Sequence, residues 1–186
     1  FYSDYRTRRC FGVCNWRIVG RLRVAADNSI LNQIFIALWL TIPIVVGGVA
    51  HMFFVTHNWL PALKTPINTR LFGENKTWRG VVVMPLVTIP GAWLLLQLLS
   101  CMPDSLELAL QNISFVWLGL LLGLGYVIME LPNSLMKRQM GIAAGETPVR
   151  SKYLFIMIDQ WDSALGFGAV YWFYVGLPIV QVLIMV

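Results

Sequence analysis

Charged residues are scarce in this sequence. Only 12% of its 186 residues are Asp, Glu, Lys or Arg, whereas 58% are hydrophobic and the mean hydropathy is +0.67. A soluble globular domain carries about 25% charged residues. The composition therefore excludes an ordinary soluble domain and indicates an all-α integral membrane protein, short enough for one compact bundle.

Cysteine and histidine are also few. The three cysteines, Cys10, Cys14 and Cys101, lack the spacing of a metal site, and we interpret them as free thiols. We interpret His51, within the first predicted helix, and His57, at its end, as structural or interfacial. The glycine spacing of a GxxxxGK[ST] phosphate loop is absent from the sequence.

Long apolar runs are what the sequence does contain. They cover residues 34–55, 81–101, 113–131 and 153–175. Each is long enough to cross the ~30 Å hydrocarbon layer of a membrane as a helix. A fifth run starts near Leu177 and is still apolar at Val186. The prediction is a bundle of about five transmembrane helices, with the fifth truncated or not crossing.

Lysine and arginine are distributed unevenly between the segments that join these runs. Segments 57–79 and 132–152 are basic, whereas segment 102–112 has no basic residue and contains Asp104 and Glu107. The positive-inside rule then predicts two functional loops in the cytoplasm. We expect a multi-pass protein of the plasma membrane whose working face is cytoplasmic.

Residues 1–29 do not fit this arrangement. They contain six arginines, which a single crossing by the first helix would place outside the cell. We expect a basic N-terminal extension here, either foreign to the native protein or disordered, followed by a single transmembrane domain over residues 30–186. The competing interpretation is a cytoplasmic arm that binds anionic lipid, with the first helix re-entrant or inverted.

Two aspartates, Asp159 and Asp162, interrupt the fourth apolar run. A carboxylate at that depth costs at least ~2.5 kcal/mol and needs a partner, such as a cation or a water-filled cavity. Their spacing places both on one helix face, and Glu130 is expected at the same membrane level. Three carboxylates near two basic loops indicate a Mg²⁺ or Mn²⁺ site for a polyphosphate. The alternative for Glu130 is a surface pair with Lys137 or Arg138.

The first basic loop contains the run Gly73-Glu-Asn-Lys-Thr-Trp-Arg-Gly80. Gly73 predicts a turn before a helix that starts near residue 76. The backbone N–H groups at that start, with Lys76, Thr77 and Arg79, would form an anion site. Arg79 would bind two phosphate oxygens at once, and Lys76 would act as a mobile point charge. The alternative is a loop that only anchors the protein to lipid headgroups.

This run is followed by two further motifs, Glu130-Leu-Pro-Asn133-Ser134-Leu-Met-Lys137-Arg138 and Asp159-Gln160-Trp-Asp162-Ser163. In this order they resemble the CDP-archaeol synthase family of integral-membrane cytidylyltransferases. The resemblance implies transfer of CMP from CTP to a lipid phosphate, with Mg²⁺ and release of pyrophosphate. It also implies about five helices and a cytoplasmic active site. Glu130 stands where archaeal members have an aspartate, which indicates a bacterial-type branch.

The resemblance also implies site residues. The catalytic set is Lys76, Arg79, Lys137, Arg138, Asp159 and Asp162. The nucleotide and phosphate set is Asn75, Lys76, Thr77, Arg79, Asn133 and Ser134. The metal set is Asp159, Asp162 and Glu130. The partners are CTP, an archaetidic-acid-like or phosphatidic-acid-like lipid and the bilayer; no nucleic acid is expected, and a homo-oligomer is left open.

Other functional classes remain open at this point. A small cation or proton-coupled transporter or channel would also place carboxylates in the membrane, although it has little use for the four cations Lys76, Arg79, Lys137 and Arg138. A lipid-binding subunit without activity and a CTP-dependent lipid kinase are further alternatives. Small residues in the third and fourth helices, Gly119, Gly123, Gly125, Ala164, Gly166 and Gly168, predict close packing between these two helices.

Overall fold

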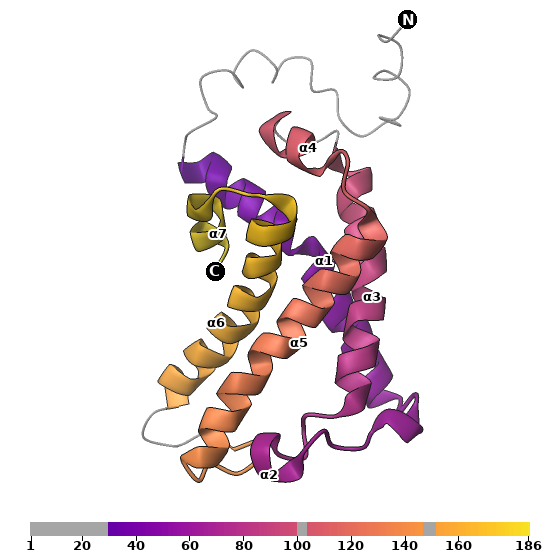
Figure 1. The fold of residues 1–186 in the computed structure, drawn as a ribbon, viewed down its shortest axis with the longest axis vertical. Coiled ribbons are helices and arrows are strands. Elements are labelled where there is room, and N and C mark those ends of the chain that lie inside the picture. The colour runs from indigo at the N-terminus through magenta and orange to yellow at the C-terminus, as the bar shows by residue number, and fades with distance from the viewer. Residues whose placement is uncertain (1–29, 100–103, 147–151) are drawn as a thin grey trace, which may run out of the picture.

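A computed structural model describes residues 30–99, 104–146 and 152–186 (Figure 1). The helices are α1 (Ile30–Thr56), α2 (Thr69–Phe72), α3 (Trp78–Gln97), α4 (Asp104–Leu110), α5 (Phe115–Gln139), α6 (Lys152–Val170) and α7 (Ile179–Met185). Short 3-10 and π-helical turns cover Pro61–Leu63 and Tyr171–Val175. Over the described ranges there is no β-strand, only an isolated bridge between Pro66 and Thr77. The all-α prediction is confirmed for this part of the chain.

Three helices, α1, α3 and α5, are long and apolar enough to cross a membrane. Helix α6 has 19 residues, but it contains both aspartates and is not among these three. Helix α7 has only 7 residues. A membrane protein is therefore supported, whereas a bundle of five crossing helices is not confirmed. The predicted extension over residues 1–29 lies outside the described residues.

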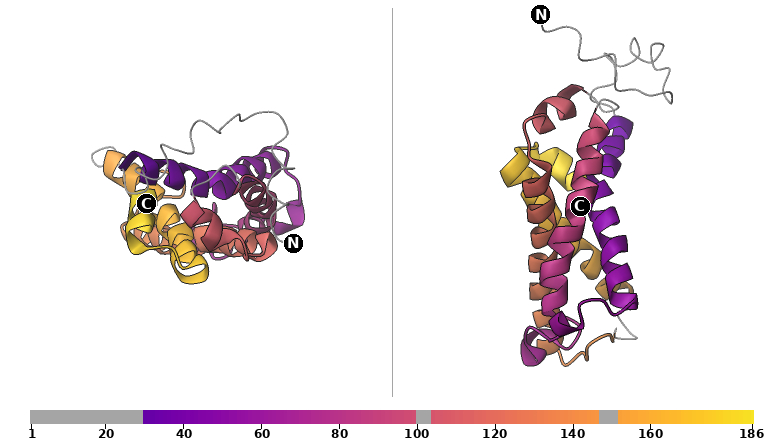
Figure 2. Two further views of the ribbon diagram at one scale, coloured as in Figure 1. Left: turned by 90° about the horizontal axis from the view of Figure 1, so that it is seen from above. Right: turned by 90° about the vertical axis from the view of Figure 1, so that its right-hand side faces the viewer.

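The long helices pack in the order of the chain. Helix α3 packs against α1 and α5, α5 packs against α6, and α7 contacts both α6 and α1 (Figures 1 and 2). Helix α2 lies at one end of the bundle and α4 lies at the other (Figure 1). The buried Tyr171 hydroxyl donates a hydrogen bond of 2.7 Å to the Leu40 carbonyl, which ties the end of α6 to α1. A buried phenol requires such an acceptor.

Glycines on α5 allow close approach on two sides of this helix. A Cβ atom on Gly123 would lie 2.5 Å from the Pro85 Cα of α3. A Cβ atom on Gly125 would lie 2.6 Å from the Gly166 carbonyl oxygen of α6. The predicted contact between the third and fourth helices is therefore confirmed at Gly125 and Gly166. Gly119 and Gly123 serve the α3 interface instead.

Helix α5 continues past the point where the sequence predicted its end. The third run was expected to stop at Leu131 and to give way to a loop at Pro132, but the helix continues to Gln139. Proline inside a helix removes a backbone hydrogen bond and costs ~3 kcal/mol. Asn133 and Ser134, directly after Pro132, are both buried on this helix. The second basic motif therefore lies on a helix and not in a loop.

Candidate active site

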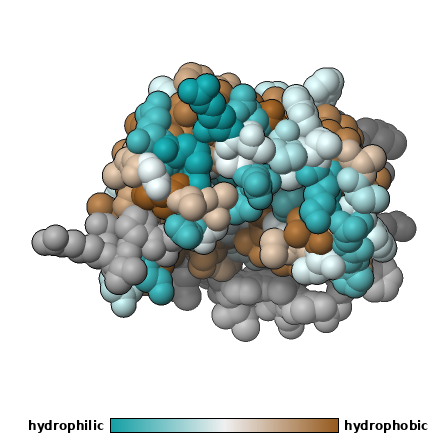
Figure 3. Space-filling view, turned by 90° about the horizontal axis from the view of Figure 1, so that it is seen from below, coloured by the Kyte–Doolittle hydropathy of each residue, from teal (hydrophilic) through white to brown (hydrophobic). Residues whose placement is uncertain are grey.

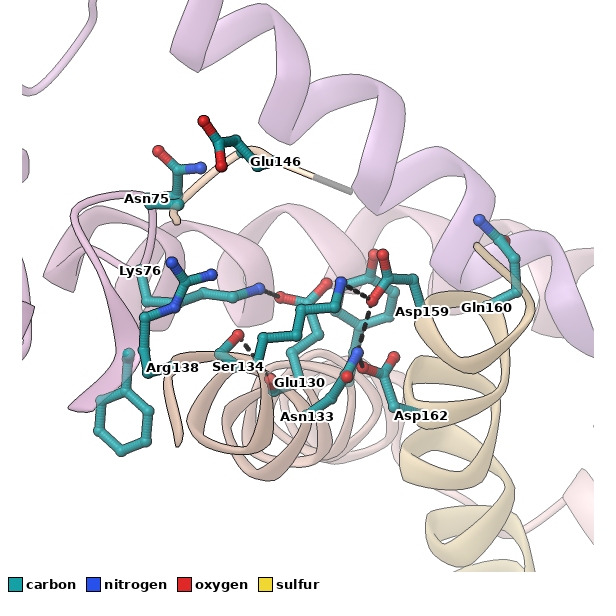
Figure 4. Close-up of a pocket in the computed structure, with 15 residues that line it drawn as sticks. Asn75, Lys76, Glu130, Asn133, Ser134, Arg138, Glu146, Asp159, Gln160 and Asp162 are labelled. Atoms are coloured by element: carbon teal, nitrogen blue, oxygen red, sulfur yellow. Dashed lines mark hydrogen bonds and ion pairs between the residues drawn. The ribbon is translucent and has the colours of Figure 1, made fainter. Parts of the chain in front are cut away.

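The two basic motifs meet at the α2 end of the bundle, next to the aspartates of α6. A cavity of about 370 Å³ opens there (Figure 4). We call it the polar cavity; it is lined by Phe72, Asn75, Lys76, Tyr126, Glu130, Asn133, Ser134, Lys137, Arg138, Ala144, Gly145, Glu146, Asp159, Gln160 and Asp162. Viewed from this end, the surface is largely hydrophilic (Figure 3). Segments far apart in the sequence thus build one polar site.

Local structure explains why the first basic motif lies here. Helix α2 ends at Gly73, which has φ of +85°, a value that other residues adopt only with strain. Helix α3 begins at Trp78, with Thr77 at its N-cap position. The predicted turn at Gly73 is confirmed, and the helix starts close to the predicted residue 76. The turn leaves Asn75 and Lys76 free to line the cavity.

Asn133 joins the two aspartates. Its side-chain nitrogen donates hydrogen bonds to Asp159 Oδ1 at 2.5 Å and to Asp162 Oδ2 at 2.6 Å. Ser163 Oγ donates to the other oxygen of Asp162 at 2.9 Å. Since both carboxylates reach one nitrogen atom, they lie on one face of α6, as the three-residue spacing predicted. The structure therefore holds Asp159 and Asp162 close together.

Both lysines of the polar cavity form ion pairs. Lys76 Nζ lies 2.5 Å from Glu130 Oε2, and Lys137 Nζ pairs with Asp159. Glu130 therefore pairs with the first basic motif and not with Lys137 or Arg138, which the alternative interpretation had proposed. The pairs are partly buried, so neighbouring solvent screens them less than it screens surface pairs. A phosphate entering the cavity would compete with these carboxylates for the lysines.

The donor atoms suit a Mg²⁺ ion. Across the described residues, no group of three or more His, Cys, Asp or Glu side chains is arranged to hold a metal. Mg²⁺ usually takes only one or two protein carboxylates and completes its shell with water and phosphate oxygens. Asp159 and Asp162 supply two converging carboxylates, and the buried Asn133 Oδ1 has no hydrogen-bond partner. The residues present fit the ion, and the metal set remains a prediction.

Arg79 and Thr77 lie apart from the polar cavity. They line a second cavity of about 870 Å³ between α1, the segment before α3, and α5. Arg79 is only 5% exposed, and its Nη1 donates to the Trp59 carbonyl at 3.3 Å. Asn75, Lys76 and Glu130 line both cavities. Every predicted site residue therefore lines the polar cavity except Thr77 and Arg79, which line the neighbouring second cavity.

The sequence analysis did not identify several residues that line the two cavities. Tyr126 lines both cavities. It precedes Glu130 by four residues on one helix, so helical spacing could have identified it. His51, interpreted as structural or interfacial, lines the second cavity. Glu146 lies beside Asn75 at the edge of the polar cavity (Figure 4), and no sequence signal marked it.

The fold and the site define a class of protein. A helical bundle with three candidate membrane spans, in which cations and paired carboxylates line one cavity, is suited to bind a polyphosphate at a membrane. Over residues 30–186 the chain matches the family described as "CarS-like: CDP-archaeol synthase", and it belongs to this family. The resemblance inferred from the three motifs is confirmed. The family implies a transferase that uses CTP and a lipid substrate in a membrane.

No curated protein and no solved structure matches the chain. Assignments of individual residues therefore depend on this structure.

Proposed function

We propose that this protein transfers CMP from CTP to the phosphate of an archaetidic-acid-like or phosphatidic-acid-like membrane lipid. An oxygen of the lipid phosphate forms a new bond to the α-phosphorus of CTP. The bond from that phosphorus to the bridging oxygen of the β-phosphate breaks, and pyrophosphate leaves with the electron pair. The observation that carries the proposal is the polar cavity, in which Lys76, Lys137 and Arg138 lie beside Asp159 and Asp162.

The cations of the polar cavity would reduce the electrostatic repulsion between the two reactants. CTP and a lipid phosphate are both anions, so catalysis depends on positioning and on neutralising charge. Lys76 and Lys137 are point charges whose present partners are carboxylates, and phosphate oxygens can replace these partners. Arg138 can bind two phosphate oxygens at once. The lipid phosphate is already ionised at neutral pH, so no Ser–His or Cys–His constellation is required.

Asp159 and Asp162 are the residues that would hold Mg²⁺ or Mn²⁺, with Glu130 as a further candidate. A bound divalent ion would offset the charge on the phosphates of CTP. Asn133 holds the two aspartates together through hydrogen bonds of 2.5 and 2.6 Å. By the positive-inside rule we expect this basic end of the bundle to face the cytoplasm, where CTP is available. We place the protein in the plasma membrane.

The proposal is tested with purified protein in detergent, Mg²⁺ and CTP labelled at either the α- or the γ-phosphate. Phosphatidic acid and its unsaturated archaeal ether counterpart are offered in parallel, with Asp162→Asn as the site variant. The proposal predicts lipid that carries the α label and not the γ label, with a loss of at least about a hundredfold in the variant. The preferred lipid identifies the branch of the family.

Two results would contradict the proposal. Lipid that carries the γ label would identify a kinase, because a kinase transfers the terminal phosphoryl group. Transfer of neither label to either lipid would remove the support for an enzyme, and cation flux into protein-containing liposomes would then test the transporter interpretation.

A further inference from the structure

Helix α1 is followed by a tight turn over residues 57–60, which we call the Trp59 turn. Asn58 has φ of +51°, and its N–H donates to the Val55 carbonyl at 3.1 Å. The Trp59 N–H donates to the Phe54 carbonyl at 3.0 Å. These two bonds form a Schellman motif, which closes a helix with one left-handed residue, here an asparagine in place of the usual glycine. The motif fixes the position of Trp59 relative to α1.

The residue after Trp59 has a strained backbone. Leu60 has φ of +54°, a region that a bulky side chain rarely occupies. It also precedes Pro61, and a residue before proline favours extended backbone. Such strain persists only where the surrounding structure imposes it, and it is common at functional sites. The shape of the Trp59 turn is therefore imposed by its surroundings.

The outer face of the Trp59 turn is aromatic and apolar. Trp59 is 50% exposed, Leu60 is 47% exposed and Phe53 is 46% exposed. The Trp59 ring lies edge to face with the rings of Phe53 and Phe54, with centroid distances of 5.2 and 5.0 Å. These contacts orient the indole while half of the residue stays uncovered.

The length of α1 indicates what covers this face. The helix has 27 residues, so it is about 40 Å long, and it is one of the three candidate membrane spans. The hydrocarbon layer is only ~30 Å thick, and the headgroups bring the bilayer to about 40–45 Å. The end of such a helix reaches the headgroup layer, where tryptophan is enriched. The partner that fits the uncovered face is therefore the polar–apolar boundary of the lipid bilayer.

The inner side of the same turn holds Arg79. The Trp59 carbonyl accepts a hydrogen bond of 3.3 Å from Arg79 Nη1. Arg79 is only 5% exposed, and its buried Nε has no hydrogen-bond partner. Among the described residues no carboxylate pairs with it. Because a buried polar group with few partners depends on those it has, a shift of the Trp59 turn is expected to displace Arg79 in the second cavity.

From these observations we infer that Trp59 is an interfacial anchor that positions Arg79. Its indole lies at the boundary of the lipid headgroups, and its carbonyl holds the guanidinium that lines the second cavity. Trp59 is a positioning residue, because it lines neither cavity and acts through Arg79. The effect on catalysis rests on the proposed function, whereas the anchor itself does not.

Quenching of tryptophan fluorescence by brominated lipids tests the anchor without turnover. The purified full chain and Trp59→Phe are placed in phosphatidylcholine vesicles with bromine near the headgroup end or near the methyl end of the acyl chains. The fluorescence lost in Trp59→Phe is the signal of Trp59. We expect the shallow bromine to quench this signal at least about twofold more strongly than the deep bromine.

Trp39→Phe is the matched control for the quenching experiment. Trp39 lies on the same helix, about 26 Å from its end. Its signal should therefore be quenched more strongly by the deep bromine.

A double-mutant cycle tests the link to Arg79. Trp59→Gln is expected to lower the rate of label transfer by about tenfold, because a small displacement of a binding group is costly. Trp59→Tyr keeps an interfacial ring and should restore the rate to within about twofold. In the Arg79→Gln background, Trp59→Gln should lower the rate by less than about twofold, since residues that act as a unit are not additive.

Trp117→Gln is the control for the cycle. Trp117 is 60% exposed on α5 and lines neither cavity. Its replacement should leave the rate within about twofold in both backgrounds.

Three results would overturn the inference. Equal or stronger quenching of the Trp59 signal by the deep bromine would place the indole away from the headgroups. Quenching by neither lipid would show that a second copy of the chain covers the Trp59 turn. Equal losses from Trp59→Gln in both backgrounds would separate Trp59 from Arg79.

A failure of the proposed function gives a different result. If the unchanged protein transferred no CMP, the proposed function would be refuted and the quenching experiment would still decide the anchor. The cycle would then be measured in thermal midpoints in the same vesicles. Additive shifts of Trp59→Gln and Arg79→Gln would overturn the link, whereas the inference predicts that they are not additive.

Discussion

At the scale of single residues, Asn133 is the residue that joins the two aspartates of the site. Its amide nitrogen is the shared donor to Asp159 and Asp162, and the residue is only 8% exposed. Two carboxylates held this close repel each other unless hydrogen bonds or a cation stabilise them. An amide provides this stabilisation without adding charge, so Asn133 positions the two aspartates for the proposed metal ion.

Asn133→Asp would place a third carboxylate at this point. We expect the variant to lose about 1–3 kcal/mol of stability in EDTA, because the three charges repel. Added Mg²⁺ should restore its thermal midpoint by more than it raises that of the unchanged protein. The measurement is thermal unfolding in detergent with and without Mg²⁺.

Asn112→Asp is the control for this experiment, since it adds the same charge at an exposed position outside both cavities. If Mg²⁺ shifted both variants equally, the assignment of the ion to Asp159 and Asp162 would be refuted.

Lys137 is a second residue whose replacement tests the site, through its effect on CTP binding. Its side chain is 12% exposed, and it neutralises Asp159 while lining the polar cavity. Lys137→Gln should weaken CTP binding by about tenfold or more, the value of a charged hydrogen bond. Lys137→Arg should recover part of the loss because it keeps the charge.

Equilibrium binding of labelled CTP checks this expectation. Lys152→Gln serves as the control, because Lys152 is exposed and does not line the cavity. Equal CTP affinity in Lys137→Gln and in the control would remove Lys137 from the nucleotide site.

At the scale of secondary structure, α5 is the helix that builds the site. Its middle part packs against α3 and α6 through glycines, and its last turns present Asn133, Lys137 and Arg138 to the cavity. The positions of the polar side chains therefore depend on how closely the helix backbones approach. Loosening either interface should displace groups that must lie within hydrogen-bonding distance.

Gly123→Ala tests the α3–α5 interface. The new Cβ atom would meet the Pro85 Cα at 2.5 Å and the Pro85 nitrogen at 2.7 Å. Because backbone atoms cannot move aside as a flexible side chain can, the two helices must separate. We expect a loss of about 1–3 kcal/mol in stability, measured as a lower thermal midpoint in detergent.

Gly48→Ala on α1 is the matched control. A Cβ atom there has no neighbour within 4 Å, and alanine favours the helix over glycine by about 0.5–1 kcal/mol. This variant should be as stable as the parent protein or slightly more stable. A Gly123→Ala protein as stable as the control would contradict the close packing of α3 and α5.

The sequence predicted the helices better than their ends. The apolar runs identify α1, α3, α5 and α6, because burial in a membrane bundle requires long apolar segments. The spacing of Asp159 and Asp162 correctly predicted a shared face, since helical geometry is local. The predicted end of α5 at Leu131 was wrong, because a proline is only a local signal of helix termination and α1, α3 and α5 all continue through prolines.

Tertiary contacts limited the prediction of the site. Glu130 pairs with Lys76, which lies on a segment 54 positions away in the chain. Neither helical spacing nor composition specifies which of several nearby cations a carboxylate meets. Lys76 lines both cavities, whereas Arg79 lines only the second, and this difference depends on the direction of the chain at the start of α3. Neighbouring positions in a motif therefore need not share a ligand.

At the scale of the whole molecule, the polar cavity lies at the α2 end of the bundle. Residues of α2, of the end of α5 and of α6 meet there, and α4 lies at the opposite end (Figures 1 and 3). The apolar shafts of the helices suit the bilayer, while the polar end suits a water-soluble nucleotide. A lipid phosphate and CTP can thus reach one site from two phases.

Binding of CTP with Mg²⁺ should stabilise the folded protein. A ligand at a concentration a hundred times its dissociation constant adds about 2.7 kcal/mol by mass action. We expect a clear rise in the thermal midpoint when CTP and Mg²⁺ are added together, and a smaller rise with either alone. Asp162→Asn should abolish the joint effect. A rise of the same size in the variant would place the nucleotide elsewhere.

The proposed transfer of CMP requires that CTP bind in the polar cavity. The most direct test is a crystal structure of the full chain with Mg²⁺ and a CTP analogue that cannot be cleaved between its α- and β-phosphates. We expect phosphate oxygens within hydrogen-bonding distance of Lys137 and Arg138, with a divalent ion on Asp159 and Asp162. A nucleotide bound outside this cavity, with the pair between Lys137 and Asp159 intact, would contradict it.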